Sequence, residues 1–290
     1  MALNGVVVVD KPRDWTSMDV CAKLRGVFHE KRVGHAGTLD PMATGVLPVF
    51  VGRATRAVDF VAEGEKEYIA TLRLGLVTDT QDTTGTVLEQ NPVPADARQK
   101  LEAILPRFTG EIEQVPPMYS AIKIRGKKLY ELARKGVEVE RKPRTVTIHA
   151  LEVVDGSDSD FTLRVVCSKG TYIRTLCHDI GQALGCGGTM AQLRRTRVGQ
   201  FALEDAVALE DLTLAENPAG FLRGVDTCFA QPSVTIQGLA LKRALCGNPF
   251  PLDAPAGEYK VFDPDGNFLL LGMSDGKECK IIKSFYEVMT

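Results

Sequence analysis

One carboxylate stands in a segment of otherwise uncharged residues that has the composition of a rigid loop. Asp40 lies within residues 34–48, where glycine occupies positions 34, 37 and 45 and Pro41 follows the carboxylate directly. Glycine lets a backbone approach a ligand closely, and proline stiffens the chain. Such a loop could hold a carboxylate at a surface, where it can stabilise a developing positive charge or act as a nucleophile. An Asp-Pro pair also begins many ordinary turns, so the pattern alone leaves a structural role open.

Several other chemistries lack their sequence patterns. The seven cysteines include no Cys-x-x-Cys pair, so we expect buried reduced thiols rather than disulfides or a zinc ribbon. The consecutive Cys-His-Asp of 177–179 points to different faces of an expected helix and cannot share a ligand. The polar turn expected at 78–85 contains Asp79 and Asp82, but it lacks the spacing of a calcium loop. No glycine motif for a nucleotide phosphate follows an expected strand. We therefore expect no metal and no cofactor.

The charge of the chain is unevenly distributed. The 290 residues are 44% hydrophobic and 25% charged and carry a net charge of −2, which is typical of a soluble globular protein. Residues 120–144, here named the basic segment, nevertheless contain nine basic residues and only three acidic ones. Such a segment is either a solvated face or a surface for phosphates. The apolar runs are shorter than the roughly 20 residues that span a bilayer, and no secretory signal is visible, so we expect a cytoplasmic protein with no membrane contact.

Periodicity predicts the elements that must position these groups. The run 6–9 reads as a buried strand, and 17–28 has N-cap chemistry followed by apolar helical spacing. Asp40 follows this helix in a loop. Alternation predicts strands at 68–76, 145–154 and 161–167, with Tyr68 facing the core. Further elements are expected as follows: a strand or helix at 46–51, helices at 55–61, 95–108, 128–135 and 171–184, and short strands after residue 232.

Six sequence blocks, in order along residues 5–201, resemble the tRNA pseudouridine synthases of the TruB type. The Asp40 loop is similar to the active-site signature of that family. Asp14 and Met18 depart from the family pattern, and both lie outside that signature. The six blocks are 6–17, 34–48, 66–68, 115–121, 168–174 and 193–199.

The resemblance implies an α+β fold of the pseudouridine-synthase type, with a mixed, mainly antiparallel sheet and flanking helices. It implies a catalytic domain at 1–231, with a basic RNA-contacting insertion at about 116–145. A small β-rich domain that resembles the PUA-like RNA-binding module would occupy 232–290. The expected reaction is isomerisation of uridine to pseudouridine at position 55 of the tRNA T-loop.

The resemblance also assigns roles to single residues. Asp40 would be the catalytic acid, and Arg174 would be its ion-pair partner, keeping it ionised and oriented. Tyr68 would stack on the target base and Tyr172 would contact the base or its ribose, although both rings could equally be core residues with satisfied hydroxyls. The other two substrate-binding residues would be Leu193, which closes the pocket, and His35, which fills the space left by a flipped base.

The basic residues are expected to bind tRNA at its T-loop and T-stem, with no guide RNA and with the protein as a monomer. The expected RNA contacts are Lys123, Arg125, Lys127, Lys128, Arg134, Arg141, Arg144, Arg194 and Arg195. Three alternatives remain: a non-catalytic RNA-binding protein on the same scaffold, an unrelated nucleotide-dependent enzyme, and a pseudouridine synthase for another RNA or one that uses a guide.

Overall fold

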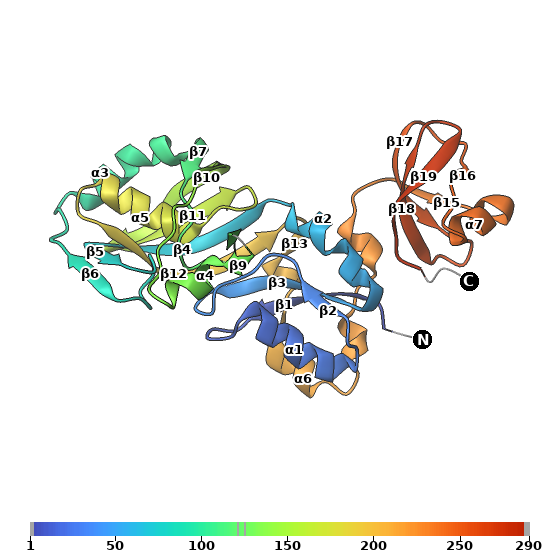
Figure 1. Cartoon of the computed structure of the whole chain (residues 1–290), viewed down its shortest axis with the longest axis horizontal. Coiled ribbons are helices and arrows are strands. Elements are labelled where there is room, and N and C mark those ends of the chain that lie inside the picture. The colour runs from blue at the N-terminus through green and yellow to red at the C-terminus, as the bar shows by residue number, and fades with distance from the viewer. Residues whose placement is uncertain (1–2, 121, 125, 287–290) are drawn as a thin grey trace. The chain divides into compact units, whose positions relative to one another are not determined.

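The polypeptide, whose helices and strands are drawn in Figure 1, forms two units, each with its own internal contacts. The structure is a computed structural model that describes residues 3–120, 122–124 and 126–286. The first unit comprises Met1–Asp40, Leu47–Ala62 and Asp205–Thr290, and the second comprises Pro41–Val46 and Glu63–Glu204. This division does not test the expected boundary after residue 231, which stays a prediction.

In the first unit, a helix with strong local end signals packs on short strands. Helix α1 (Ser17–Phe28) begins with a capping box, in which the amide of Asp19 donates to the Thr16 hydroxyl (3.0 Å) and the amide of Thr16 donates to the Asp19 carboxylate (2.9 Å). It ends at His29, whose φ of 50° is left-handed. Val20, Cys21 and Leu24 are fully buried against valines of the neighbouring strands. The predicted helix is therefore confirmed with the predicted bounds.

The remaining elements of the first unit before its C-terminal sheet are short. Strand β1 (Gly5–Lys11) is the expected buried strand, and it pairs in parallel with β14 (Val207–Ala208). Strand β2 (Val33–His35) pairs antiparallel with the last residues of β3 (Thr44–Val51), whose first three residues belong to the second unit. Residues 46–51 therefore form a strand rather than a helix. The helices are η1 (Gly52–Ala57), α2 (Val58–Ala62), α6 (Leu209–Leu214), η4 (Pro218–Phe221) and η5 (Val225–Cys228). Of the short helix η3 (Leu203–Asp205), the last residue belongs to the first unit and the first two to the second.

The second unit is built on a long antiparallel arrangement of strands. The order is β12-β4-β11-β10-β7, all neighbours being antiparallel, and the first residues of β3 join β12 in parallel. In β4 every second residue is buried, and Tyr68 lies on the buried side as predicted. The strands are β4 (Lys66–Leu74), β7 (Gly110–Gln114), β10 (Arg144–Ser157), β11 (Asp160–Cys167), β12 (Gly188–Val198) and β13 (Phe201–Ala202).

Helices and two small hairpins complete the second unit (Figure 1). The expected helix at 95–108 is divided into α3 (Ala97–Ile104) and η2 (Leu105–Phe108), because Pro106 interrupts the α-helical hydrogen bonds. Helix α5 (Ile173–Ala183) packs on β12. One hairpin joins β5 (Leu76–Thr78) and β6 (Val87–Gln90). The basic segment contains the other, formed by β8 (Lys123–Ile124) and β9 (Lys127–Lys128), and then α4 (Leu129–Ala133).

A separate five-stranded sheet with its own core occupies the end of the chain, where short strands were expected. Its order is β15-β17-β18-β19-β16, with β15 parallel to β17 and the other pairs antiparallel. Phe250, Val261 and Leu270 are fully buried in the core of this sheet. The elements are β15 (Ser233–Thr235), α7 (Gly238–Leu245), β16 (Phe250–Pro251), β17 (Gly257–Phe262), β18 (Phe268–Ser274) and β19 (Glu278–Ser284). The α+β class with mainly antiparallel sheets is confirmed.

Two expectations about cysteines and membranes can be compared with the described residues. Six of the seven cysteines are buried free thiols, and Cys246 is exposed. Within residues 3–120, 122–124 and 126–286, no cluster of His, Cys, Asp or Glu has the grouping of a metal site, and no helix is long and apolar enough to cross a membrane.

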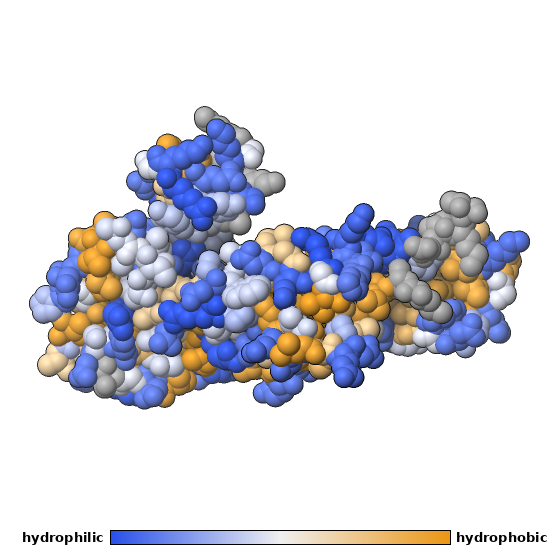
Figure 2. Space-filling view, turned by 90° about the horizontal axis from the view of Figure 1, so that it is seen from below, coloured by the Kyte–Doolittle hydropathy of each residue, from blue (hydrophilic) through white to orange (hydrophobic). Residues whose placement is uncertain are grey.

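On the face shown in Figure 2, small groups of hydrophobic residues lie among hydrophilic ones. Isolated exposed apolar residues of this kind mark no site by themselves.

Candidate active site

The loop that carries Asp40 is anchored by the residue directly before it. The hydroxyl of Ser17, at the start of α1, accepts from the amide of Leu39 (2.9 Å) and donates to the carbonyl of Leu39 (3.2 Å). Ser17 and Leu39 are both buried, whereas Asp40 is half-buried. Two hydrogen bonds to one residue fix its backbone in both directions along the chain. The fold thus fixes the backbone directly before Asp40 and leaves part of Asp40 exposed.

Gly45 allows two backbones to approach each other at the end of this segment. It has a φ of +100°, and a Cβ atom there would lie 2.1 Å from the carbonyl oxygen of Arg195. Gly45 is also the register partner of Arg195 where β3 pairs with β12. No other residue type fits without moving backbone, because the neighbouring atoms are main-chain atoms. The glycine is therefore needed for the β3–β12 pairing.

Strands β4 and β12 bring Tyr68 and Arg195 together. They are register partners, and the fully buried Arg195 guanidinium hydrogen-bonds the Tyr68 hydroxyl and donates from Nε to the carbonyl of Val46 (2.8 Å). Burial lowers the pKa of Arg195, and the contact with Tyr68 raises it in part. Leu193, two residues earlier on the same side of β12, is also buried.

The prediction that Arg195 contacts RNA does not fit this position. The side chain has no exposed surface, and its donors are directed to protein acceptors. Arg194 and Arg195 were both expected to contact RNA, but they are consecutive residues of a strand, in which neighbouring side chains point to opposite sides. Arg194 is half-buried and its Nη1 donates to the Thr44 hydroxyl (3.3 Å).

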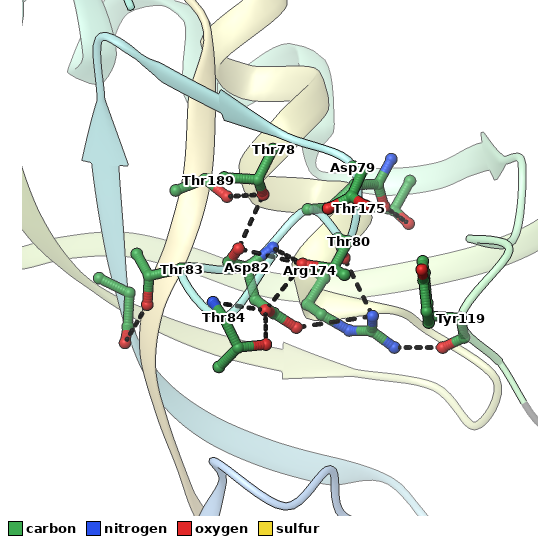
Figure 3. Close-up of polar contacts among 12 residues, drawn as sticks. Thr78, Asp79, Thr80, Asp82, Thr83, Thr84, Tyr119, Arg174, Thr175 and Thr189 are labelled. Carbon is green, nitrogen blue, oxygen red and sulfur yellow. Dashed lines mark hydrogen bonds and ion pairs between the residues drawn. The ribbon is translucent and has the colours of Figure 1, made fainter. Parts of the chain in front are cut away.

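Arg174 is buried at the start of α5 and is held by the loop between β5 and β6 (Figure 3). Its Nη1 donates to the carbonyl of Thr80 (3.0 Å) and lies 3.6 Å from Oδ2 of Asp82. Its Nη2 donates to the carbonyl of Tyr119 (2.7 Å), where the chain enters the basic segment. The side chains of Arg174 and Asp82 are only 5% and 7% exposed, so the ion pair is largely shielded from water.

The carboxylate of Asp82 organises its own loop. Its Oδ1 accepts from the Thr80 hydroxyl (2.9 Å) and from both the amide (2.9 Å) and the hydroxyl (2.5 Å) of Thr84. The second oxygen, Oδ2, faces Arg174. The loop is also fastened to β12, because the amide of Thr83 donates to the carbonyl of Met190 (3.0 Å). The two carboxylate oxygens therefore have separate tasks, one within the loop and one toward the arginine.

A glutamine side chain fixes the residue before this helix. Gln114, at the end of β7, accepts through Oε1 from the amide of Tyr172 (3.0 Å) and donates through Nε2 to the carbonyl of Tyr172 (3.3 Å). Gln114 is 1% exposed, and Tyr172 is half-buried. The amide imitates a β-ladder pair, so the Tyr172 backbone has a fixed orientation. Tyr172 and Arg174 are thus positioned together, as neighbours on one anchored helix start.

The remaining predicted RNA contacts lie mainly on the basic segment. Lys127, Arg134 and Arg144 are exposed. Lys128 and Arg141 are half-buried: Lys128 Nζ lies 3.3 Å from the Tyr130 hydroxyl, and Arg141 contacts Glu138 (3.0 Å) and the carbonyl of Pro116 (3.3 Å). Lys123 belongs to β8. The prediction for Arg125 lies outside the described residues.

Sequence reasoning missed Asp82 and Gln114. It tested Asp82 only against a calcium loop, although aspartate among threonines is also the pattern of a hydrogen-bonded turn. Gln114 carried no signal beyond its place two residues before Pro116-Pro117.

The predicted site residues come from both units. His35, at the end of β2, and Asp40 belong to the first unit, whereas Tyr68, Tyr172, Arg174 and Leu193 belong to the second. The ion pair between Asp40 and Arg174 remains a prediction.

Comparisons with known proteins identify the fold and then the family. The solved structure of a Cbf5-Nop10-Gar1 complex contains a chain that superposes with a TM-score of 0.72 at 28% identity, covering 98% of this chain and 85% of that one. A chain in the structure of an H/ACA RNP bound to a substrate RNA containing 2'-deoxyuridine matches with the same TM-score at 27% identity, over 97% and 85% of the two chains. The architecture is thus that of a pseudouridine synthase.

The sequence comparisons are more specific. Residues 25–173 match the family described as TruB family pseudouridylate synthase (N terminal domain), and residues 174–223 match the tRNA pseudouridylate synthase B C-terminal domain. A curated tRNA pseudouridine synthase B of Clostridium kluyveri is 42% identical over 98% of this chain and 100% of its own length. That of Burkholderia lata is 48% identical over 90% and 84% of the two chains. The chain belongs to the TruB family of pseudouridine synthases and is an isomerase.

Proposed function

We propose that this enzyme converts uridine 55 in the T-loop of tRNA to pseudouridine, without a cofactor, by means of Asp40 acting on a flipped-out nucleotide. The observation that carries the proposal is the anchored Asp40 loop, in which Ser17 holds Leu39 from both sides and leaves the next residue half-buried. The tRNA substrate is supported by the names of curated relatives at 42–48% identity.

The isomerisation needs a group that stabilises a sugar cation. The bond between N1 of uracil and C1' of ribose breaks, the base turns, and a bond forms between C5 and C1'. The hydrogen on C5 leaves as a proton, and N1 gains one, so atoms and electrons balance with no oxidant or reductant. Positive charge develops on the ribose while the first bond breaks, and an ionised carboxylate beside it lowers that barrier. Asp40 takes this role, either through its charge or by adding to the sugar.

The other residues of the site hold the aspartate and the substrate. In this proposal Arg174 pairs with Asp40 while Asp82 and the Thr80 carbonyl hold the arginine itself. Tyr68 stacks on the base with its hydroxyl anchored by Arg195, and Tyr172 and Leu193 line the same pocket. Aromatic stacking on a base contributes about 1–3 kcal/mol. His35 occupies the space that the flipped base leaves.

The basic segment offsets the cost of extracting the uridine. Unstacking a base costs a few kcal/mol, which phosphate contacts can offset. Lys123, Arg125, Lys127, Lys128, Arg134, Arg141, Arg144 and Arg194 are the proposed contacts, and Arg195 is no longer among them. We propose that a monomer acts without a guide RNA, because the relatives named for tRNA are 42–48% identical, whereas the chains from the H/ACA RNP and the Cbf5-Nop10-Gar1 complex are 27% and 28% identical.

Release of tritium from tRNA labelled at C5 of uridine tests the proposal. Asp40→Asn should abolish release and leave the Kd for tRNA within about tenfold, because the charge acts on the reacting sugar rather than on binding. Asp59→Asn, at an exposed carboxylate on α2, is the matched control and should retain activity. A tRNA with cytidine at position 55 should release nothing. Turnover by Asp40→Asn would reject the aspartate, and binding without release by the native chain would favour a non-catalytic RNA-binding protein.

A further inference from the structure

We propose that Gln81 is a positioning residue for Arg174, and that it acts through Thr175. The inference rests on the proposed function, in which Arg174 orients the catalytic aspartate. The Thr175 hydroxyl donates to Oε1 of Gln81 (2.8 Å), and Thr175 is 2% exposed. This hydrogen bond joins the β5–β6 loop to helix α5 beside the contacts of Arg174 (Figure 3).

Consecutive residues of the loop meet consecutive residues of the helix. Thr80 and Asp82 both contact Arg174, and Gln81, which lies between them, contacts Thr175. If the loop slid along the helix or the helix turned, the contacts of Arg174 and the Gln81–Thr175 bond would have to break together. The second bond therefore narrows the range of positions that the guanidinium can take. Displacement of a catalytic group by about 1 Å can lower a rate about 100-fold.

The backbone of Gln81 has a conformation that glycine would adopt at lower cost. Its φ is +63°, in the left-handed region that side chains other than Asn and Asp rarely enter. Main-chain bonds maintain it, because the Gln81 amide donates to the carbonyl of Thr78 (3.3 Å) and the Gln81 carbonyl accepts from the amide of Met190 (3.0 Å). A strained residue beside a site is an observation from which function can be inferred. Here the strain presents a long polar side chain to the helix.

This geometry separates positioning from folding in a single substitution. Gln81→Gly removes the acceptor of the buried Thr175 hydroxyl, which lowers stability, and relieves the left-handed backbone, which raises it, so the melting temperature should change little. Asp158→Gly is the matched control, since Asp158 has a φ of 55° in an exposed turn between β10 and β11. This control should keep or raise the melting temperature, with unchanged activity.

Single-turnover tritium release and tRNA affinity provide the readout. Gln81→Gly should lower the rate constant about tenfold with the Kd for tRNA within about twofold, because only the reacting geometry changes. Thr175→Val should give a similar loss, and Thr175→Ser, which keeps the hydroxyl, should restore the rate. The double variant Gln81→Gly with Thr175→Val should be no slower than the worse single variant, because both changes break one bond.

The outcomes distinguish this inference from the proposed function. Full activity of Gln81→Gly, multiplicative losses in the double variant, or failure of Thr175→Ser to restore the rate would each overturn the positioning role. If any of these three results occurs while Asp40→Asn is inactive, the proposed function is retained and the positioning role of Gln81 is rejected. If Asp40→Asn is active, the proposed function falls first, whatever the Gln81 variants do.

Discussion

Replacing Asp82 by asparagine removes the ion pair that holds Arg174 and keeps the hydrogen bonds of the loop, so the effect of the ion pair can be measured by itself. The three hydrogen bonds that the Asp82 carboxylate accepts within the loop are all made by Oδ1, and Oδ2 faces the arginine at 3.6 Å. Asparagine can keep its carbonyl oxygen at the first position and place its NH₂ group at the second. The substitution thus preserves the hydrogen bonds that shape the loop. At the position next to Arg174 it replaces a negatively charged acceptor by a neutral hydrogen-bond donor.

The size of the effect follows from the distance and the burial. Two unit charges 3.6 Å apart attract each other by about 5 kcal/mol at an effective dielectric constant of about 20. Removing one partner of a buried pair costs about 3–5 kcal/mol, because the other charge stays buried and uncompensated. The Thr80 and Tyr119 carbonyls still accept from Arg174, so we expect the lower end, a loss of about 3 kcal/mol in the free energy of unfolding.

Activity should fall with stability, and the control lies in the same loop. The rate constant for tritium release should drop about 100-fold, since a displaced Arg174 no longer orients the aspartate. Urea unfolding gives the stability, and single-turnover release gives the rate. Asp79→Asn changes an exposed carboxylate whose Oδ1 accepts from the amide of Thr86 (2.7 Å), and it should change neither quantity appreciably. If Asp82→Asn were as stable and as active as Asp79→Asn, the reasoning from the buried pair would be refuted.

Two further predictions concern RNA binding and the buried thiols. Changing Lys127 and Lys128 to glutamine should weaken tRNA binding and reduce the slope of log K against log salt by about 0.7–0.9 per lost phosphate contact, whereas Lys100→Gln on α3 should leave it unchanged. An unaltered slope for the pair would mean that these lysines do not meet phosphates. Burial raises the pKa of five thiols, that of Cys177 to about 12, so the folded chain keeps protons that the unfolded chain loses near pH 9. The free energy of unfolding should therefore fall from pH 9 upward in urea titrations, because the five thiols outweigh the opposite effect of Lys66, whose pKa burial lowers to about 8. A rise over this range would contradict the burial of the thiols.

Much of the fold was predictable because its signals are local. The capping residues of α1 and the alternation along β4 lie within a few residues of the elements that they define. Local sequence misled at Arg195, which was expected to contact RNA and which strand β12 places inside the protein. The helix expected at 171–184 began two residues later, because Gln114 holds Tyr172 outside it.

By itself, the sequence determined most element types, the family blocks and the candidate aspartate, because caps, periodicity and motif spacing act over short stretches of chain, and the resemblance that those blocks carry implied the α+β class. Only the tertiary structure decided what surrounds Arg174. Thr80 and Asp82 come from one loop and Tyr119 from the entrance of the basic segment, and they meet the helix only once the strands between them have paired. Partners so distant along the chain leave no periodic signal, since their proximity is a property of the folded sheet and not of any segment in it.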